Sequence, residues 1–390
     1  MLKQIGKIFK NMNSTLLFWT SVMFIYGLFN IVTASSREAE VMYNVSLYYY
    51  FFRQLTMLVI GIVGSLIIIN VDTKKYPLIS FILYIFIFGT LIYMLLKGTA
   101  DRGSINWINF PLIGRFQPSE AAKPIMIVFL AFIMDKLSNL VNIENKKRWK
   151  YIIIIFLIMF SLPGIIFFQN DMGTAFILLS ITIIMFLGGP VKTKDKAKAA
   201  VVCLILVLLV AGTRYITKGY VLTEEQISRI TDFMKPCSKY TDGGYQACND
   251  FIAINNGGLK GVGIGQSTQK YSYIPEPHTD SVFAIISEEY GLIFTTAILI
   301  IYFIIIRTIL KIAYDAENLM NKYMCLGCAA YIFLHIVVNL GGLLGLLPMT
   351  GVPLPFLSYG GTFAISLMGM LAIVQRVAIE TNINKKKVKI

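Results

Sequence analysis

The segment from Tyr271 to Gly291, YSYIPEPHTDSVFAIISEEYG, gathers titratable side chains where a polar loop enters an apolar segment. Asp280 and Thr279 both precede the first apolar residues, and either side chain could cap the helix expected there. Because one cap suffices, a second role is open, and a carboxylate at this point can take a proton from a reacting group. His278 is a candidate to orient Asp280 or the loop.

Two further clusters place charges beside apolar segments. In FQPSEAAKP, Glu120 and Lys123 are three residues apart and therefore neighbours on a helix. Two interpretations are open: an ion pair that neutralises both charges, or a site in which Lys123 offers its cation to a phosphate while Glu120 orients it. In QNDMGTA, Asp171 precedes Met172 as an N-cap residue does, and we favour this role over a cation or substrate contact.

Acids and a histidine also lie within apolar segments, where ionisable groups are costly. Glu288 and Glu289 are deep enough to need partners, and His335 is interpreted as an interior histidine rather than a ligand. The glycine-rich run from Asn255 to Lys270, NNGGLKGVGIGQSTQK, follows no strand and so is not a dinucleotide fingerprint. It fits either a backbone nest for an anion, with Lys260 and Lys270 beside it, or a flexible loop.

Composition indicates which elements must position these residues. Of the 390 residues, 56% are apolar and 14% are charged, and the mean hydropathy is +0.69, which excludes an ordinary soluble domain. Because a bilayer core about 30 Å thick needs roughly 20 apolar residues per helix, the sequence predicts an all-α polytopic membrane protein, residues 1–390, with about ten transmembrane helices. The expected spans are Leu16–Ala34, Phe51–Val71, Pro77–Leu96, Ala121–Met134, Tyr151–Phe168, Gly173–Leu187, Ala199–Ala211, Val282–Ile306, Tyr323–Leu347 and Thr362–Val377.

Lysine and arginine are distributed unevenly among the connections. The formal net charge is +14, and the basic clusters at the two termini and at 74–75, 146–150 and 192–198 fall on one side of the ten spans. The positive-inside rule makes this side cytoplasmic and places both termini there, so the charge is a topology signal and predicts no nucleic-acid partner. The outer side then carries three loops that we interpret as functional, 97–120, 212–281 and 347–361. The second, between helices seven and eight, is expected to begin a short amphipathic helix at Thr223–Met234.

Five cysteines divide into two groups. Cys203, Cys325 and Cys328 lie in apolar spans, where the Cys-x-x-Cys spacing is interpreted as two small packing residues rather than a redox or zinc site. Cys237 and Cys248 lie in the long outward loop, where an oxidising exterior permits a disulfide. Whether they pair depends on geometry that the sequence does not show.

Four stretches resemble the signatures of the SEDS proteins (shape, elongation, division and sporulation), of which FtsW and RodA are the best known. They are FQPSEAAK, DMGTA, GGLKGVGIGQSTQKYSYIPEPHTDSVFAIISEEYG and GLLPMTGVPLPFLSYGG, and they appear in the family's order between Trp107 and Gly361. The resemblance implies a peptidoglycan glycosyltransferase that polymerises lipid II at the outer face of the bacterial cell membrane, for division or elongation. It also implies a class B penicillin-binding protein, a transpeptidase, as partner.

The resemblance carries over to individual residues. The family's essential acid falls on Asp280, its loop tryptophan on Trp107, and its glutamate and lysine pair on Glu120 and Lys123; Ser358 of SYGGT is a further candidate substrate contact. The chain also departs from the family pattern. Asn106 replaces an arginine, Asn170 replaces a proline, GYQACND replaces the more usual GYQ..QS, and SYGGT replaces SYGGS. None of these departures touches Asp280.

Glycan polymerisation requires a sugar hydroxyl to attack an anomeric carbon while a lipid pyrophosphate leaves. Asp280 is our hypothesis for the base that takes the hydroxyl proton, which is worth about 10²- to 10⁴-fold in rate. Fixed positive charge stabilises the leaving pyrophosphate. Basic side chains could supply this charge, or a divalent cation, Mg²⁺ or Mn²⁺, bound by the outer carboxylates. No organic cofactor is expected. The substrate-binding candidates are Trp107, Glu120, Lys123, Asp171, Arg229, Lys270, His278 and Ser358, of which Lys123, Arg229 and Lys270 are the candidate cations.

A competing hypothesis is a lipid II flippase or another polytopic transporter, because embedded acids and helix ends at a cavity also suit a carrier. A carrier requires charges along its whole path through the membrane. Here the intramembrane charges are concentrated in the outer half, which favours an enzyme.

Overall fold

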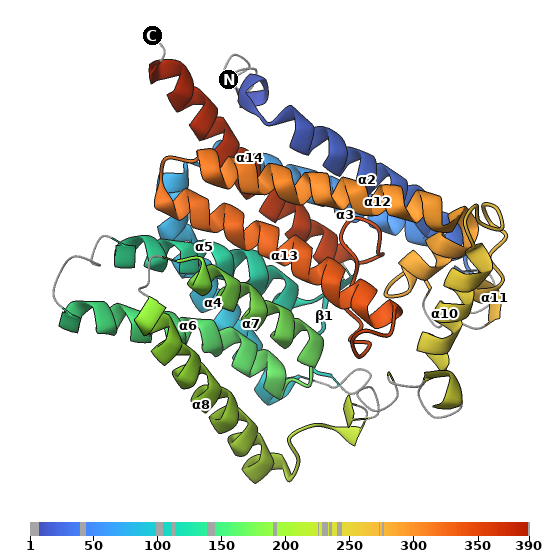
Figure 1. Ribbon diagram of the computed structural model, residues 1–390, viewed down its shortest axis with the longest axis horizontal. Coiled ribbons are helices and arrows are strands. Elements are labelled where there is room, and N and C mark those ends of the chain that lie inside the picture. The colour runs from blue at the N-terminus through green and yellow to red at the C-terminus, as the bar shows by residue number, and fades with distance from the viewer. Residues whose placement is uncertain are drawn as a thin grey trace.

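Helices make up most of the chain in the computed structural model (Figure 1). The structure describes residues 8–39, 44–98, 104–110, 114–138, 145–189, 193–224, 226–227, 233, 236–239, 244–272, 274 and 277–388. The long helices are α2 (Ser14–Ala34), α3 (Tyr49–Asn70), α4 (Tyr76–Lys97), α5 (Pro118–Ser138), α6 (Asn145–Phe168), α7 (Met172–Leu187), α8 (Thr193–Lys218), α12 (Val282–Asp315), α13 (Leu319–Leu343) and α14 (Gly361–Val388). The shorter elements are η2 (Thr73–Lys75), η3 (Pro236–Lys239), α10 (Tyr245–Gly257), α11 (Gln269–Ser272), and the antiparallel strands β1 (Ile108–Phe110) and β2 (Gly114–Phe116).

Each of the ten spans expected from hydropathy overlaps one of these long helices. Within the described residues, eight helices are long and apolar enough to cross a membrane. The other two are α7, which has only 16 residues, and α5, which carries Glu120 in its first turn and Lys136 in its last. The prediction of an all-α, multi-pass membrane protein is therefore confirmed.

Burial separates central helices from lipid-facing ones. In the most apolar 18-residue window of α13 and of α14, 78% of the residues are buried, whereas the figure for α8 is 6%. Figure 1 shows α8 at the lower edge of the bundle, beside α6. Large exposed apolar side chains cover the outer helices, including Phe86 on α4 and Ile216 on α8. Such a surface is stable only when hydrocarbon covers it.

The two ends of the bundle differ in the segments they carry. Both chain ends lie at the upper left in Figure 1, and α10 and α11 lie at the right. Arg376 of α14 is paired with Glu380 at 2.8 Å and with Asp72, which lies between α3 and η2, at 3.2 Å. Glu380 also accepts hydrogen bonds from the backbone and hydroxyl of Thr73. Of the loops in which we expected functional residues, the loop 212–281 carries the helices α10 and α11 seen at the right.

A break within α12 joins this helix to the glycine-rich run. Gly291 interrupts the helix with φ 78° and ψ 177°, a conformation open essentially only to glycine. The carbonyl groups released by the break accept hydrogen bonds from the run: Val262 N–H donates to Glu288 O at 2.9 Å, and Gly263 N–H donates to Glu289 O at 3.1 Å. These amides are used within the protein, so this segment is neither a flexible loop nor an anion nest built on them.

Glycine at two other positions permits this close approach. A Cβ atom at Gly257 would lie 1.9 Å from the backbone oxygen of Ser287, and one at Gly261 would lie 2.2 Å from that of Glu289. No side chain fits at such distances. The spacing of these glycines is therefore explained by backbone packing against α12.

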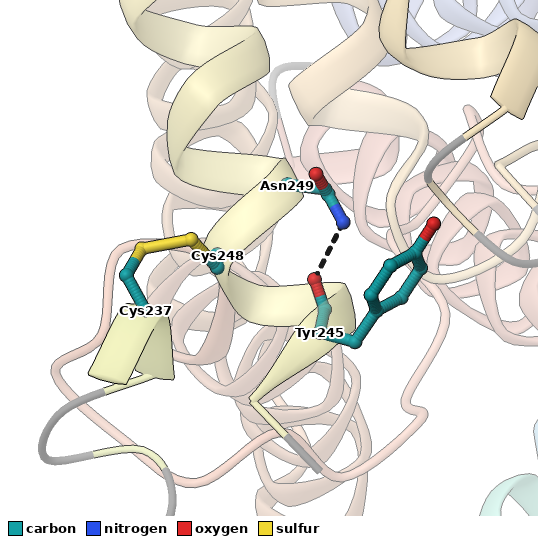
Figure 2. The surroundings of a disulfide bond; sticks show 4 residues. All are labelled: Cys237, Tyr245, Cys248 and Asn249. Carbon is teal, nitrogen blue, oxygen red and sulfur yellow. Dashed lines mark hydrogen bonds between the residues drawn. A yellow bond between two sulfur atoms is a disulfide. The ribbon is translucent and has the colours of Figure 1, made fainter. Parts of the chain in front are cut away.

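The long connection between α8 and α12 is folded onto the bundle. Cys237 of η3 and Cys248 of α10 form a disulfide with sulfur atoms 2.02 Å apart, as Figure 2 shows. This pairing confirms the permitted disulfide. Thr223 and Gln226 exchange hydrogen bonds between their side chains and backbone amides, which is the capping box expected at the start of the helix. Most of the remainder of that predicted helix lies outside the described residues.

Candidate active site

The backbone before α12 is held by hydrogen bonds to three consecutive carbonyl groups. Tyr359 N–H donates to His278 O at 2.8 Å, and the Ser358 hydroxyl donates to Thr279 O at 2.6 Å. Asn339 Nδ2 of α13 donates to Asp280 O at 2.8 Å. The segment between α13 and α14, together with Asn339 of α13, therefore holds each of the three residues of the HTD motif.

This clamp is itself rigid. Ser358 Oγ also accepts from Leu354 N–H at 2.8 Å, and Asn339 Nδ2 also donates to Val352 O at 2.9 Å. The proline-rich segment, residues 347–360, is irregular, and Phe356 within it has φ 70°. Ser358 is only 2% exposed, so its observed role is to position Thr279, and its contact with substrate stays a prediction.

The Asp280 side chain lies at a small pocket between α13 and the proline-rich segment. Asp280, Asn339, Met349, Thr350 and Gly351 are among the lining residues. Gly351 has φ 69°, and a Cβ atom there would lie 3.2 Å from Asp280 Oδ2. Glycine at this position therefore leaves space beside the carboxylate. Asp280 is partly exposed at this pocket, whose volume of about 10 Å³ is room for about one water molecule.

His278 points away from this pocket and into an aromatic cluster. Its ring centroid lies 4.5 Å from that of Tyr50 and 5.2 Å from that of Tyr359. Its Nδ1 atom lies 3.1 Å from Glu38 Oε2. These contacts support a loop-orienting role. Sequence reasoning missed Glu38 because the connection between α2 and α3 showed no motif.

Glu120 and Lys123 form the expected ion pair on α5. Lys123 Nζ lies 2.7 Å from Glu120 Oε1, and the side chains are 1% and 3% exposed. Lys123 Nζ also lies 3.2 Å from His335 Nε2, whose Nδ1 lies 3.0 Å from Pro353 O. This buried chain of contacts connects α5 to α13 and to the segment that clamps the HTD motif. It confirms the ion pair and the interior role of His335.

The two glutamates inside α12 have the partners that burial requires. Glu288 accepts hydrogen bonds from five groups of the 256–269 segment, including the Ser267 hydroxyl at 2.5 Å and the Thr268 hydroxyl at 2.9 Å. Glu289 pairs with Lys270 Nζ at 2.7 Å, and both side chains are at most 1% exposed. Lys270 therefore anchors the loop in the observed state.

Asp171 caps α7 and also accepts hydrogen bonds from two side chains of the outer loop 97–120. Its Oδ1 atom accepts from Thr174 N–H at 3.1 Å, which confirms the favoured cap. Its Oδ2 atom accepts from Asn106 Nδ2 and Gln117 Nε2, each at 3.0 Å. The adjacent Trp107 is 39% exposed, so its indole is available for contact.

Arg214 of α8 is a buried cation that sequence reasoning missed. It is 0% exposed. Its guanidinium donates to Phe167 O at 2.8 Å and to Asn170 Oδ1 at 2.7 Å, capping the end of α6. Asn170 has φ 66°, which asparagine tolerates better than most residues. An arginine at the end of an apolar span was the available signal.

Two further arginines, Arg229 and Arg53, are candidates to supply positive charge to the site. Arg229 lies outside the described residues. Arg53, near the start of α3, lines a surface pocket together with Tyr49 and Thr56. Tyr50, on the same turn of α3, contacts His278. Among the described residues, no three His, Cys, Asp or Glu side chains converge to hold a metal ion.

Comparison with known proteins agrees with this architecture. The family model described as cell cycle protein, which covers FtsW, RodA and SpoVE, matches residues 13–383. The chain belongs to this family. It is 33% identical to stage V sporulation protein E of Bacillus subtilis, over 92% of this chain and 95% of that protein. It is 31% identical to a probable peptidoglycan glycosyltransferase FtsW of Coxiella burnetii, over 86% and 87% of the two chains.

Two solved structures share the fold of this SEDS family member. One comes from a study of the structural coordination of polymerization and crosslinking by a peptidoglycan synthase complex. Its TM-score is 0.73 at 22% identity, over 95% of this chain and 98% of that chain. The other is the rod shape determining protein RodA of Thermus thermophilus, with a TM-score of 0.66, 19% identity and coverage of 94% and 96%.

Proposed function

We propose that this SEDS protein is a peptidoglycan glycosyltransferase that polymerises lipid II at the outer face of the bacterial cytoplasmic membrane. Family membership and the name of the FtsW relative support the activity. The observation that carries the site is the position of Asp280. Its backbone is clamped through the carbonyls of 278–280, while its carboxylate lies at a pocket.

Four of the other acids singled out from the sequence are committed to structure. Glu120, Glu288 and Glu289 are at most 3% exposed and hydrogen-bonded, and Asp171 accepts three hydrogen bonds. A general base must reach a substrate proton at hydrogen-bond distance. Asp280 meets this requirement better than these four acids, because its side chain is partly exposed at the pocket.

In the proposed reaction, Asp280 accepts the proton of a sugar hydroxyl while the hydroxyl oxygen attacks the anomeric carbon of a second lipid-linked sugar. The bond to the lipid pyrophosphate breaks, and the pyrophosphate leaves with the electron pair. Attack from the opposite side inverts the carbon and gives a β-linkage. The clamp contributes by holding the base in one orientation, because a misplacement of about 1 Å can cost about 100-fold in rate.

The leaving pyrophosphate needs positive charge near the site. Lys123 and Lys270 are buried in ion pairs, so each can reach a phosphate only when its pair opens. Arg53 is partly exposed at a surface pocket and is the additional candidate that the structure supplies. A divalent cation held between substrate phosphates and one or two carboxylates remains part of the proposal.

The partner and the membrane face are also proposals. One of the solved structures with this fold comes from a peptidoglycan synthase complex that coordinates polymerization and crosslinking. This similarity supports a class B penicillin-binding protein, a transpeptidase, as the partner. The basic clusters at the end that carries both termini support a cytoplasmic location for that end and an outer location for Asp280.

The test is polymerisation of labelled lipid II by the purified protein, with and without the partner transpeptidase. Wild type is expected to give glycan chains and Asp280→Asn to give none, because the amide keeps the shape but cannot take the proton. Asp315→Asn, at the opposite end, is the control and should polymerise normally. A wild-type rate from Asp280→Asn would refute the mechanism, and movement of lipid II without polymerisation would support the transporter.

A further inference from the structure

Asp250 is a buried acid in α10 that the mechanism above does not use. It is 0% exposed, and its Oδ2 atom accepts a hydrogen bond from the Ser281 hydroxyl at 3.1 Å. Gln246, one turn earlier on α10, donates from Nε2 to the same hydroxyl at 3.1 Å. Ser281 directly follows Asp280. Two side chains of α10 therefore hold the residue next to the proposed base.

Ser281 is the N-cap residue of α12, but its side chain makes no capping hydrogen bond. Serine is favoured at this position because its oxygen normally accepts from a backbone amide of the first turn. Here the Ser281 hydroxyl donates its hydrogen bond to Asp250 instead. The side chain at the start of α12 therefore binds α10 and does not cap its own helix. The carbonyl of Ser281 still accepts from Ala284 N–H at 2.9 Å, so the helix starts normally.

We infer that Asp250 is a positioning residue for the transfer reaction: its buried carboxyl group fixes Ser281 and thereby the orientation of Asp280. The inference rests on the proposed function of Asp280 as base. It assigns to α10 a role that the family pattern does not predict, because Asp250 stands in GYQACND, where the pattern GYQ..QS has serine.

The protonation state follows from the surroundings of Asp250. The pKa of Asp250 is raised to about 8, chiefly by burial; the hydrogen bond from Ser281 lowers it, and the negative charge of Asp280 contributes to the rise. The acids farther along α12 are enclosed by other partners, Glu288 by the 256–269 segment and Glu289 by Lys270. The carboxyl of Asp250 is therefore mostly protonated at neutral pH.

Among the side chains that the structure describes on α11 and α13, which pack against α10, none adds an unpaired charge. From α11, Lys270 is bound to Glu289. From α13, Asn339 is uncharged, and His335 lies against Lys123 and Pro353. On α10 itself Cys248 is in the disulfide. Ionisation of Asp250 would thus place a second negative charge beside Asp280, and the repulsion would push α10 from the start of α12.

Ionisation of Asp250 makes the stability of the folded state depend on pH. The folded state holds the Asp250 proton up to about pH 8, whereas an unfolded aspartate releases it near pH 3.8. Between these values the folded state binds more protons, so this group makes the folded state less stable as pH rises. Polymerisation should fall above about pH 8 for the same reason, as Asp280 loses its support.

The experiment compares three purified variants with wild type over pH 6.5–9.5, with lipid II polymerisation and thermal unfolding as readouts. Asp250→Asn keeps the shape of the neutral acid and cannot ionise. Asp250→Ala removes the contact to Ser281. Asn255→Ala, at an exposed position of the same helix, is the matched control.

We expect Asp250→Ala to reduce the polymerisation rate about tenfold or more at pH 7, since a small misplacement of a base has a large effect. Asp250→Asn should rescue this loss and keep its polymerisation rate above pH 8, where the rate of wild type declines. Its unfolding temperature should not fall between pH 6.5 and about 8, where that of wild type falls because Asp250 ionises. A purely structural role would lower the unfolding temperature without changing the shape of the pH profile.

The outcomes separate the two proposals. If wild type polymerises and Asp280→Asn does not, while Asp250→Asn declines above pH 8 as wild type does, the inference on Asp250 is wrong and the assignment of Asp280 stands. A rate for folded Asp250→Ala equal to that of Asn255→Ala leads to the same conclusion. Polymerisation by Asp280→Asn would overturn both.

Discussion

The hydroxyl of Ser358 lies 2.6 Å from the backbone oxygen of Thr279, although 79 residues separate them in the sequence. The same hydroxyl accepts a hydrogen bond from Leu354 N–H, so it connects the proline-rich segment to the HTD motif with both its donor and its acceptor. This contact makes the segment before α14 part of the support for Asp280.

Ser358→Ala should lower both activity and stability. The substitution leaves Thr279 O and Leu354 N–H without this partner in a buried site, at a cost of about 1–3 kcal/mol. We expect the polymerisation rate to fall about tenfold or more because Asp280 loses a fixed neighbour. Thr296→Ala removes an exposed hydroxyl that bonds only within α12 and should change neither quantity. Equal rates for both variants would show that the clamp does not matter.

Breaking the buried pair on α5 should be more damaging than removing it. Glu120→Gln leaves Lys123 charged at 1% exposure, and we expect a loss of about 3–5 kcal/mol in the free energy of unfolding. The double variant Glu120→Gln with Lys123→Met removes both charges and should recover much of this loss. Lys385→Gln, which breaks the exposed pair with Asp315, should cost less than about 1 kcal/mol. Additive effects of the two α5 substitutions would contradict the coupling.

Gly291→Ala should destabilise the break in α12. The residue has φ 78°, and an added Cβ atom would lie 2.4 Å from Gly261 N, so strain and a clash combine to about 3 kcal/mol or more. Gly164→Ala in α6 is the matched control, because nothing lies within 4 Å of its added Cβ atom and alanine favours helix. Thermal unfolding measures both. Similar unfolding temperatures for the two variants would show that the break can straighten.

Reduction of the Cys237–Cys248 disulfide should lower the unfolding temperature. The bridge closes a short loop with a sequence separation of 11 and is expected to contribute about 2–3 kcal/mol. The double variant Cys237→Ser, Cys248→Ser should start from the lower temperature and show no response to a reductant. A response in that variant would implicate other groups. The free thiols of Cys325 and Cys328 are buried and should not react in the folded protein.

The architecture was predictable because membrane burial leaves a strong local signal. Runs of about 20 apolar residues define helices without reference to the rest of the chain, and all ten expected spans overlap observed helices. The Asp171 cap and the Glu120–Lys123 pair were also predictable, since their partners lie within three residues.

The support around Asp280 could not be predicted, because every contact in it joins distant segments. Tyr359, Ser358 and Asn339 reach the 278–280 backbone from α13 and from the segment before α14. Asp250 looked like an ordinary polar loop residue, and only the packing of α10 on α12 buries it against Ser281. The sequence by itself determined the helices, the family and the candidate base, since these depend on local composition and motifs. The tertiary structure decided which acids are committed to packing and which one lies at a pocket, because burial and hydrogen bonding depend on what the rest of the chain places beside each group.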